Sequence, residues 1–170
     1  MTTQTQSTTV QVHRVYIKAT PQAVWDAITD PAWNARYGYG GNGTYDLRPG
    51  GPFRVVSSKE MKQADAAGGF PVPDVAVDGE VLESDPPHRL VLTWRLLLDP
   101  GIAAEGFTKV TYEIEETQGG TKLTVFHDLE GAPALAALVS GEHEAAGGGG
   151  WPWVLSDLKS LLETGTAFSR

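Results

Sequence analysis

Hydrophobic and polar positions alternate along several short stretches of the chain, a pattern typical of half-buried β-strands. The alternation is most regular from 109 to 116, where Val110, Tyr112 and Ile114 share one face and Lys109 lies on the other. Similar alternation predicts further strands at 10–18, 44–58, 75–85, 88–98 and 121–131, the second of them split by a Pro-Gly-Gly turn. One polar face on each strand indicates an antiparallel sheet that needs cover on its other face only.

Helical periodicity follows the first strand. Thr20 is a good N-cap, Pro21 suits a first turn, and the apolar residues that follow predict a helix over 20–29. A second short helix is predicted over 31–37. Residues 59–74 are expected to form an irregular loop, and 133–139 a short helix.

The last element is the long one. Apolar residues recur there at helical spacing, at Trp151, Val154, Leu155, Leu158, Leu161 and Leu162. Pro152 is tolerated in a first turn, and Gly165 is a suitable C-cap. The order is therefore a strand, two short helices, about six antiparallel strands and a long helix. It predicts an α+β fold in which a curved antiparallel sheet wraps around the C-terminal helix.

Composition sets the scale. With 170 residues, 41% of them hydrophobic, the chain fits one domain over 10–170, preceded by a polar tail over 1–9. The absence of cysteine excludes disulfides, thiolate nucleophiles and Cys-ligated metals.

Charge and hydropathy argue against a nucleic-acid partner and against a membrane span. The formal net charge is −8 and the 13 Lys and Arg residues are scattered, which argues against a nucleic-acid partner. The chain has no signal peptide pattern and no apolar run near the ~20 residues that a membrane span needs. A cytoplasmic location is expected.

Five stretches resemble a known superfamily. In order they are PQAVWDAITDP, RPGGPFR, DGEVLESDPPHRLVLTW, VTYEIEETQGGTKLTVFHDLEG and GGWPWVLSDLKSLLETG, covering about Val12 to Gly165. Together they resemble the START-like (SRPBCC) superfamily, and within it the bacterial branch similar to the activator of the heat-shock chaperone ATPase. The resemblance implies the helix-grip fold, with a deep apolar cavity between the sheet and the long helix.

The superfamily contains carriers, receptors, cyclases and co-chaperones, so fold alone says little about function. The chain departs from the short family pattern at 59–74 and at the glycine run 147–150. Both segments are expected near the edge of the cavity. A flexible glycine run could let the last helix seat on the sheet and open the entrance, or it could be an unconstrained surface loop.

Histidine is the first candidate for chemistry. Only His127 shares a face with core leucines, and the resemblance places a family histidine there. It could be a polar handle for a ligand, or a histidine satisfied by a structural hydrogen bond. The sequence Glu142-His143-Glu144 lacks the second histidine of a zinc motif, so no metal and no organic cofactor is expected.

Aromatic residues are the second class of candidates, either as ordinary core or as lining of a cavity. The predicted ligand-binding residues are Trp33, Tyr37, Phe53, Trp94, Tyr112, His127, Trp151 and Leu155. Trp153 faces away from Trp151 and is expected under a neighbouring loop or exposed. Trp25 is expected to be structural, and Glu83 to be the solvated end of a strand.

Three functions remain open. The leading one is non-enzymatic binding of a small hydrophobic molecule, as a carrier or sensor. The second is a co-chaperone-like or regulatory protein-interaction module, which predicts an exposed apolar patch. The third is a cyclase or hydrolase that uses His127 as acid and base. A homodimer is possible in each case.

Overall fold

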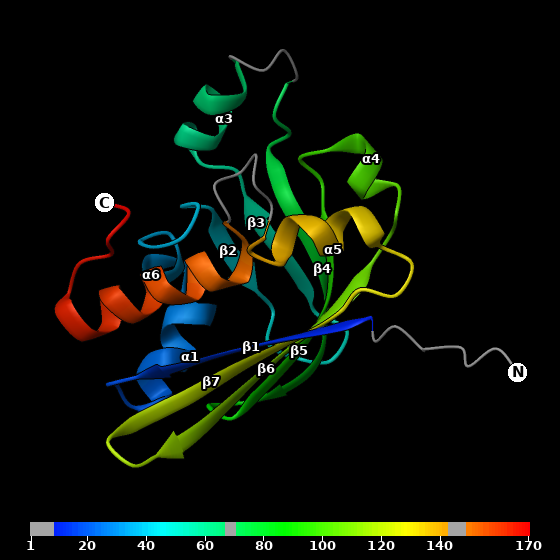
Figure 1. Ribbon diagram of the computed structural model, residues 1–170. Helices are drawn as coiled ribbons and strands as arrows, with labels where there is room; N and C mark the ends of the chain where they lie inside the picture. Colours follow the sequence, from blue (N-terminus) through cyan, green and yellow to red (C-terminus); the bar gives the residue numbers. More distant parts are fainter. Residues whose placement is uncertain (1–8, 67–70, 143–148) are drawn as a thin grey trace, which may run out of the picture.

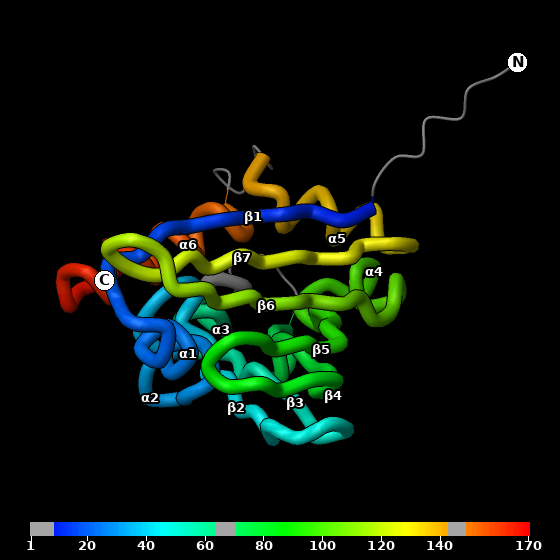
Figure 2. The backbone as a smooth tube through the Cα atoms, turned by 90° about the horizontal axis from the view of Figure 1, so that it is seen from below, coloured from blue at the N-terminus to red at the C-terminus, as the bar shows by residue number. Residues whose placement is uncertain are grey.

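A computed structural model describes residues 9–66, 71–142 and 149–170. Its seven strands form one antiparallel sheet in the order β1-β7-β6-β5-β4-β3-β2 (Figures 1 and 2). The strands are β1 (Val10–Ile17), β2 (Asn42–Tyr45), β3 (Pro52–Val56), β4 (Val75–Asp85), β5 (Arg89–Leu96), β6 (Thr108–Thr117) and β7 (Gly120–Asp128). The only large step in this order joins β1 to β7, the first strand to the last.

Six helices are described: α1 (Pro21–Thr29), α2 (Pro31–Asn34), α3 (Lys59–Ala66), α4 (Pro100–Ala103), α5 (Pro133–Val139) and α6 (Gly150–Thr164). The longest, α6, crosses the sheet on one face, and α1 lies beside it (Figure 1). Seven curved strands, two short helices after the first strand and a long last helix confirm the predicted helix-grip fold.

Local sequence signals explain the helix ends. The Thr20 side chain accepts a hydrogen bond from the Ala23 N–H, as an N-cap should. Asp30 caps α2 in the same way, through the Ala32 N–H. The C-terminal end of α6 is capped by Gly165, whose φ of 85° is a left-handed conformation that favours glycine.

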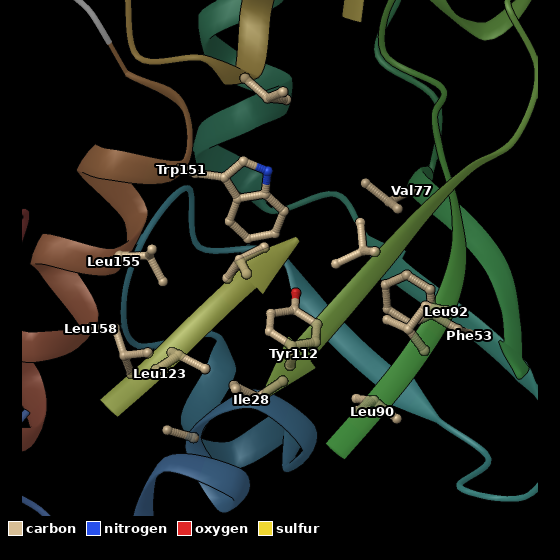
Figure 3. Close-up of a cluster of buried hydrophobic side chains, with 14 of the residues drawn as sticks. Ile28, Phe53, Val77, Leu90, Leu92, Tyr112, Leu123, Trp151, Leu155 and Leu158 are labelled. Carbon is tan, nitrogen blue, oxygen red and sulfur yellow. The ribbon is translucent and has the colours of Figure 1, made fainter. Parts of the chain in front are cut away.

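The core lies between the sheet and α6. Leu90 and Leu92 of β5, Leu123 of β7 and Leu158 of α6 are almost completely buried, and Figure 3 shows them facing one space. Trp25 is 4% exposed, which agrees with a structural role. Glu83 is exposed and pairs with Arg89, as expected for a solvated strand end.

Three details differ from the sequence expectations. The helix predicted over 31–37 already ends at Asn34. Residues 59–66 form the helix α3, because Ser58 caps it through the Met61 N–H and the segment has no internal glycine or proline. The four-residue helix α4, capped by Asp99, interrupts the connection between β5 and β6.

The predicted tail falls on residues 1–8, which lie outside the described part, and on Thr9. The Thr9 carbonyl accepts a hydrogen bond from the Leu129 N–H, so this residue continues the pairing of β1 with β7.

Candidate functional site

A cavity of about 450 Å³ lies between the sheet and α6. Six aromatic side chains line it: Tyr37, Tyr39, Tyr45, Trp94, Tyr112 and Trp151. Thirteen aliphatic or methionine side chains complete the walls, among them Val77 of β4, Met61 of α3 and Leu155 of α6. Among the described residues that line it, none is charged and Asn34 is the only amide.

The walls formed by the sheet and by α6 follow from strand and helix periodicity. Trp94 and Leu96 of β5 and Tyr112 of β6 are the inward positions of alternating strands. Trp151, Leu155 and Leu158 form one stripe of α6 and face Tyr112 and Leu123 (Figure 3). The ring of Tyr112 meets the indole of Trp151 edge to face, with centroids 6.0 Å apart.

His127 is buried behind this wall and does not line the cavity. The Trp151 indole N–H donates to His127 Nδ1 at 3.1 Å. The opposite nitrogen, Nε2, lies 2.7 Å from the Thr108 hydroxyl, which in turn donates to the Trp94 carbonyl at 2.9 Å. Since Nδ1 must accept, the neutral ring carries its proton on Nε2 and donates to Thr108.

This network gives His127 a structural function, the second of the two interpretations of its sequence position. It ties the first turn of α6, through Trp151, to β5, β6 and β7 at once. Burial lowers the pKa of His127 to about 4; the nearby His13 acts in the same direction and Asp128 against it. The ring is therefore neutral at pH 7 and both its nitrogens are occupied.

Three segments meet at one part of the lining: the loop after α2, the end of α5 and the start of α6. The Gly150 N–H donates to the Tyr39 hydroxyl at 3.2 Å. A Cβ at Gly150, whose φ is 65°, would lie 2.5 Å from the Val139 carbonyl oxygen. Close approach is thus what requires glycine at 150. Gly147 and Gly148 lie outside the described residues, so the flexible-connection hypothesis is not tested there.

A buried aspartate holds the same loop to α6. Asp157 is fully buried; its carboxylate accepts from the Gly38 N–H at 2.8 Å and from the Ser169 N–H at 3.1 Å, and it also accepts from the Ser169 hydroxyl. The carboxylate therefore joins three separate segments: loop, helix and C-terminal residues.

Five of the eight predicted site residues line the cavity: Tyr37, Trp94, Tyr112, Trp151 and Leu155. Phe53 lies behind the wall, stacked on Tyr45 at 4.7 Å, and Trp33 packs against the core with Arg36 over its ring. His127 supports Trp151 from behind.

Sequence reasoning missed Tyr45, Tyr39 and Met61. Tyr45 lies between the polar residues Thr44 and Asp46, and that alternation could have identified it. The other two belong to the loop after α2 and to α3, which the hydrophobic pattern did not place near the cavity.

Trp153 stacks on Tyr39 with centroids 4.9 Å apart and meets Phe168 edge to face at 5.7 Å. It therefore packs against the neighbouring loop, as expected. Tyr39 and Phe168 are each more than half exposed, so these three rings form a surface cluster.

The described ranges contain neither a cluster of metal-binding side chains nor a membrane-spanning helix. No group of three His, Asp or Glu side chains there could hold a metal ion. None of the described helices is long and apolar enough to cross a membrane. The Glu142-His143-Glu144 stretch falls mostly on residues that the structure does not describe.

Comparison with models of known protein families identifies the family of this chain. The model of the family "Activator of Hsp90 ATPase homolog 1-like protein" (AHSA1) matches residues 18–163. The chain belongs to the AHSA1 family. This confirms the predicted resemblance, and the match extends from the end of β1 almost to the end of α6. No curated protein sequence matches this AHSA1-family protein.

Solved structures share the fold. Protein MLL2253 from Mesorhizobium loti is 22% identical, with a TM-score of 0.64 over 90% of this chain and 96% of that one. The solution structure of the BPP1335 product from Bordetella parapertussis is 23% identical, with a TM-score of 0.65 over 98% and 80%. PFC0360w, an HSP90 activator from Plasmodium falciparum, is 22% identical, with a TM-score of 0.51 over 70% and 71%.

Proposed function

We propose that this AHSA1-family protein binds a small hydrophobic molecule in the cavity between the sheet and α6, as a carrier or sensor. The observation that carries the proposal is the cavity itself. Its volume of about 450 Å³ falls within the range of roughly 300–1,000 Å³ that is usual for small-molecule sites. Its walls are aromatic and aliphatic, as such sites require.

The lining favours a neutral molecule. Burying a charge without a partner is costly, and none of the described lining residues offers a charge of either sign. The indoles of Trp94 and Trp151 and the ring of Tyr112 present aromatic surface to an occupant. Such rings favour flat or aromatic ligands through offset and edge-to-face contacts.

The enzymatic alternative depended on His127, and the structure lends it no support. A general base must reach a proton on the substrate, yet His127 lies behind Trp151. Its Nδ1 accepts from the indole and its Nε2 is bonded to Thr108. A pKa near 4 also leaves it a weak base at pH 7.

A second candidate function is a co-chaperone-like protein interaction. The family description and the HSP90-activator neighbour motivate it, and the exposed cluster of Tyr39, Trp153 and Phe168 supplies an apolar surface. If this function holds, the purified protein stimulates the ATPase of Hsp90, and Phe168→Ser weakens the stimulation. No stimulation by the unmodified protein would contradict it.

Native mass spectrometry of freshly purified protein, followed by titration with 2-ethylnaphthalene, tests the leading proposal. Two variants make the same change in different places. Val77→Phe fills part of the cavity, whereas Val12→Phe adds a ring at a residue of β1 that is 43% exposed. We expect a small-molecule adduct or saturable probe binding in the unmodified protein and in Val12→Phe, and its loss in Val77→Phe.

Absence of both the adduct and the probe binding from the unmodified protein would contradict the proposal. So would binding that Val77→Phe leaves unchanged, provided that circular dichroism shows both variants folded. The same spectra measure whether the protein is a monomer or a homodimer. A cytoplasmic location belongs to the proposal and is tested by fractionating cells that produce the protein.

A further inference from the structure

Two phenol hydroxyls in the cavity wall, those of Tyr112 and Tyr45, have no hydrogen-bond partner among the residues that the structure describes. Tyr112 is 8% exposed, and its hydroxyl makes no hydrogen bond to any of them. Figure 3 shows this hydroxyl pointing away from β6 into the space between Trp151 and Val77. A hydroxyl that faces an apolar cavity and has no partner in the protein is available to donate a hydrogen bond to a bound molecule.

Three other polar side chains of the lining, those of Tyr37, Asn34 and Tyr39, form hydrogen bonds within the protein. The Tyr37 hydroxyl donates to the Ala27 carbonyl at 3.0 Å. The Asn34 amide donates to the Gly43 carbonyl at 2.9 Å and accepts from the Gly43 N–H at 3.0 Å. The Tyr39 hydroxyl accepts from Gly150. The Tyr37 and Asn34 side chains are thus committed within the protein. The Tyr112 hydroxyl is free to donate, and on the same wall the Tyr45 hydroxyl is also without a partner among the described residues.

The surroundings keep the Tyr112 hydroxyl protonated. Burial raises its pKa well above the ordinary value for tyrosine. Tyr45 shares the same wall, and its pKa is raised by burial first and then by the proximity of Tyr112 and Tyr37. Both phenols are therefore neutral at pH 7 and able to donate a hydrogen bond.

We propose that Tyr112 donates a hydrogen bond to a neutral oxygen atom of the ligand, such as a ketone carbonyl. This inference rests on the proposed function and specifies the class of ligand: an apolar, largely aromatic body with one neutral acceptor oxygen. A carboxylate is disfavoured because no lining cation among the described residues would compensate its charge. Trp94 and Trp151 contact the body, while Tyr112 selects the oxygen.

A pair of matched probes isolates this hydrogen bond. 2-Acetylnaphthalene and 2-ethylnaphthalene have nearly the same shape, and only the first carries a carbonyl oxygen. Both are titrated against the unmodified protein and against Tyr112→Phe, which removes the hydroxyl and keeps the ring. Tryptophan fluorescence gives the dissociation constant of each probe. The measured quantity is the ratio of the two constants.

We expect Tyr112→Phe to lower the preference for the ketone about five- to tenfold, the usual effect of one buried hydrogen bond. Its affinity for 2-ethylnaphthalene should stay nearly constant. The control Tyr16→Phe removes the hydroxyl of a residue that is 58% exposed and should leave the ratio unchanged. The anion 2-naphthoate should bind at least tenfold more weakly than the ketone.

The outcomes separate the two proposals. If both probes bind but Tyr112→Phe leaves their ratio unchanged, the role of Tyr112 is wrong and the cavity function stands. Equal affinity for 2-naphthoate and the ketone contradicts the neutral ligand class. If neither probe binds the unmodified protein, the inference fails; if native mass spectrometry also shows no adduct, the proposed function fails with it.

Discussion

His127 and Tyr112 are buried polar side chains on adjacent strands, and they end in opposite circumstances. The ring of His127 accepts from Trp151 and is bonded to Thr108, so no hydrogen-bonding capacity remains. On the adjacent strand β6, Tyr112 lies two residues beyond Val110, the residue that pairs with His127. Its hydroxyl reaches the cavity and has no hydrogen-bond partner among the described residues. A fully satisfied buried group holds the fold together, whereas an unpartnered one in a cavity wall is, under the proposed function, available to a ligand.

The largest effect in this comparison should come from His127→Leu. The change leaves the indole N–H of Trp151 without its acceptor and deprives Thr108 of its donor, both in the interior. Each unsatisfied buried group costs about 1–3 kcal/mol, so the free energy of unfolding should fall by about 4 kcal/mol. Urea denaturation measures it, and the exposed His88→Leu is the matched control, with a change below about 0.5 kcal/mol.

A His127→Leu variant that is as stable as the His88→Leu variant would show that the network does not hold α6.

By contrast, Tyr112→Phe should change the free energy of unfolding by no more than about 1 kcal/mol, because its hydroxyl has no bond to lose among the described residues.

The pH dependence of stability sharpens the contrast. The unfolded chain protonates His127 near its ordinary pKa of 6.5, but the folded protein does so only near 4, because burial disfavours the charged ring. Between these values the unfolded state binds more protons, so the free energy of unfolding falls as the pH falls from 6.5 to 4. The loss should reach about 3 kcal/mol.

His127→Gln tests the source of this pH dependence, since glutamine does not titrate. Denaturation at several pH values should show a flatter profile from 6.5 to 4 in this variant than in the unmodified protein. Identical profiles would mean that carboxylates, and not His127, govern stability in this range.

Asp157→Asn should have the next largest effect. The amide keeps one acceptor oxygen but loses the second, so the contacts with Gly38 and Ser169 can no longer all form. We expect the free energy of unfolding to fall by about 2 kcal/mol. Probe dissociation should also become faster, because the loop that lines the cavity is held less firmly. Stopped-flow fluorescence measures that rate, with the exposed Asp85→Asn as the control; equal rates would contradict this function of Asp157.

The smallest effect concerns Tyr37, a cavity phenol that already has a partner. Tyr37→Phe removes its hydrogen bond to the Ala27 carbonyl and should lower the free energy of unfolding by about 1 kcal/mol. The preference for the ketone probe should change far less than in Tyr112→Phe. An equal or larger loss of preference would transfer the proposed contact from Tyr112 to Tyr37.

The fold could be predicted because its signals are local. Alternation in the strands, the caps at Thr20 and Gly165 and the apolar stripe of the last helix each follow from neighbouring residues. The helix α3 could not be predicted, because the hydrophobic periodicity of its residues is weak and the whole segment 59–74 has the composition of a loop. The need for glycine at 150 depends on the approach of Val139, eleven residues earlier.

The candidate site could be predicted only in part. Strand alternation identified Trp94 and Tyr112, and helical spacing identified Trp151 and Leu155. Strand alternation also selected His127 and Phe53, because a shared face does not tell whether a side chain meets the cavity or lies behind another ring. That depends on the side chain opposite: Trp151 covers His127, and Tyr45 covers Phe53.

The most direct test of the central claim uses the five tryptophans as reporters. Their indole N–H signals are followed by ¹⁵N-resolved NMR during titration with 2-acetylnaphthalene. Trp94 and Trp151 line the cavity, Trp25 is buried elsewhere, and Trp153 belongs to the surface cluster. The account predicts saturable shifts of Trp94 and Trp151 with little change at Trp25. Shifts confined to Trp153, or none at all, would contradict a ligand cavity between the sheet and α6.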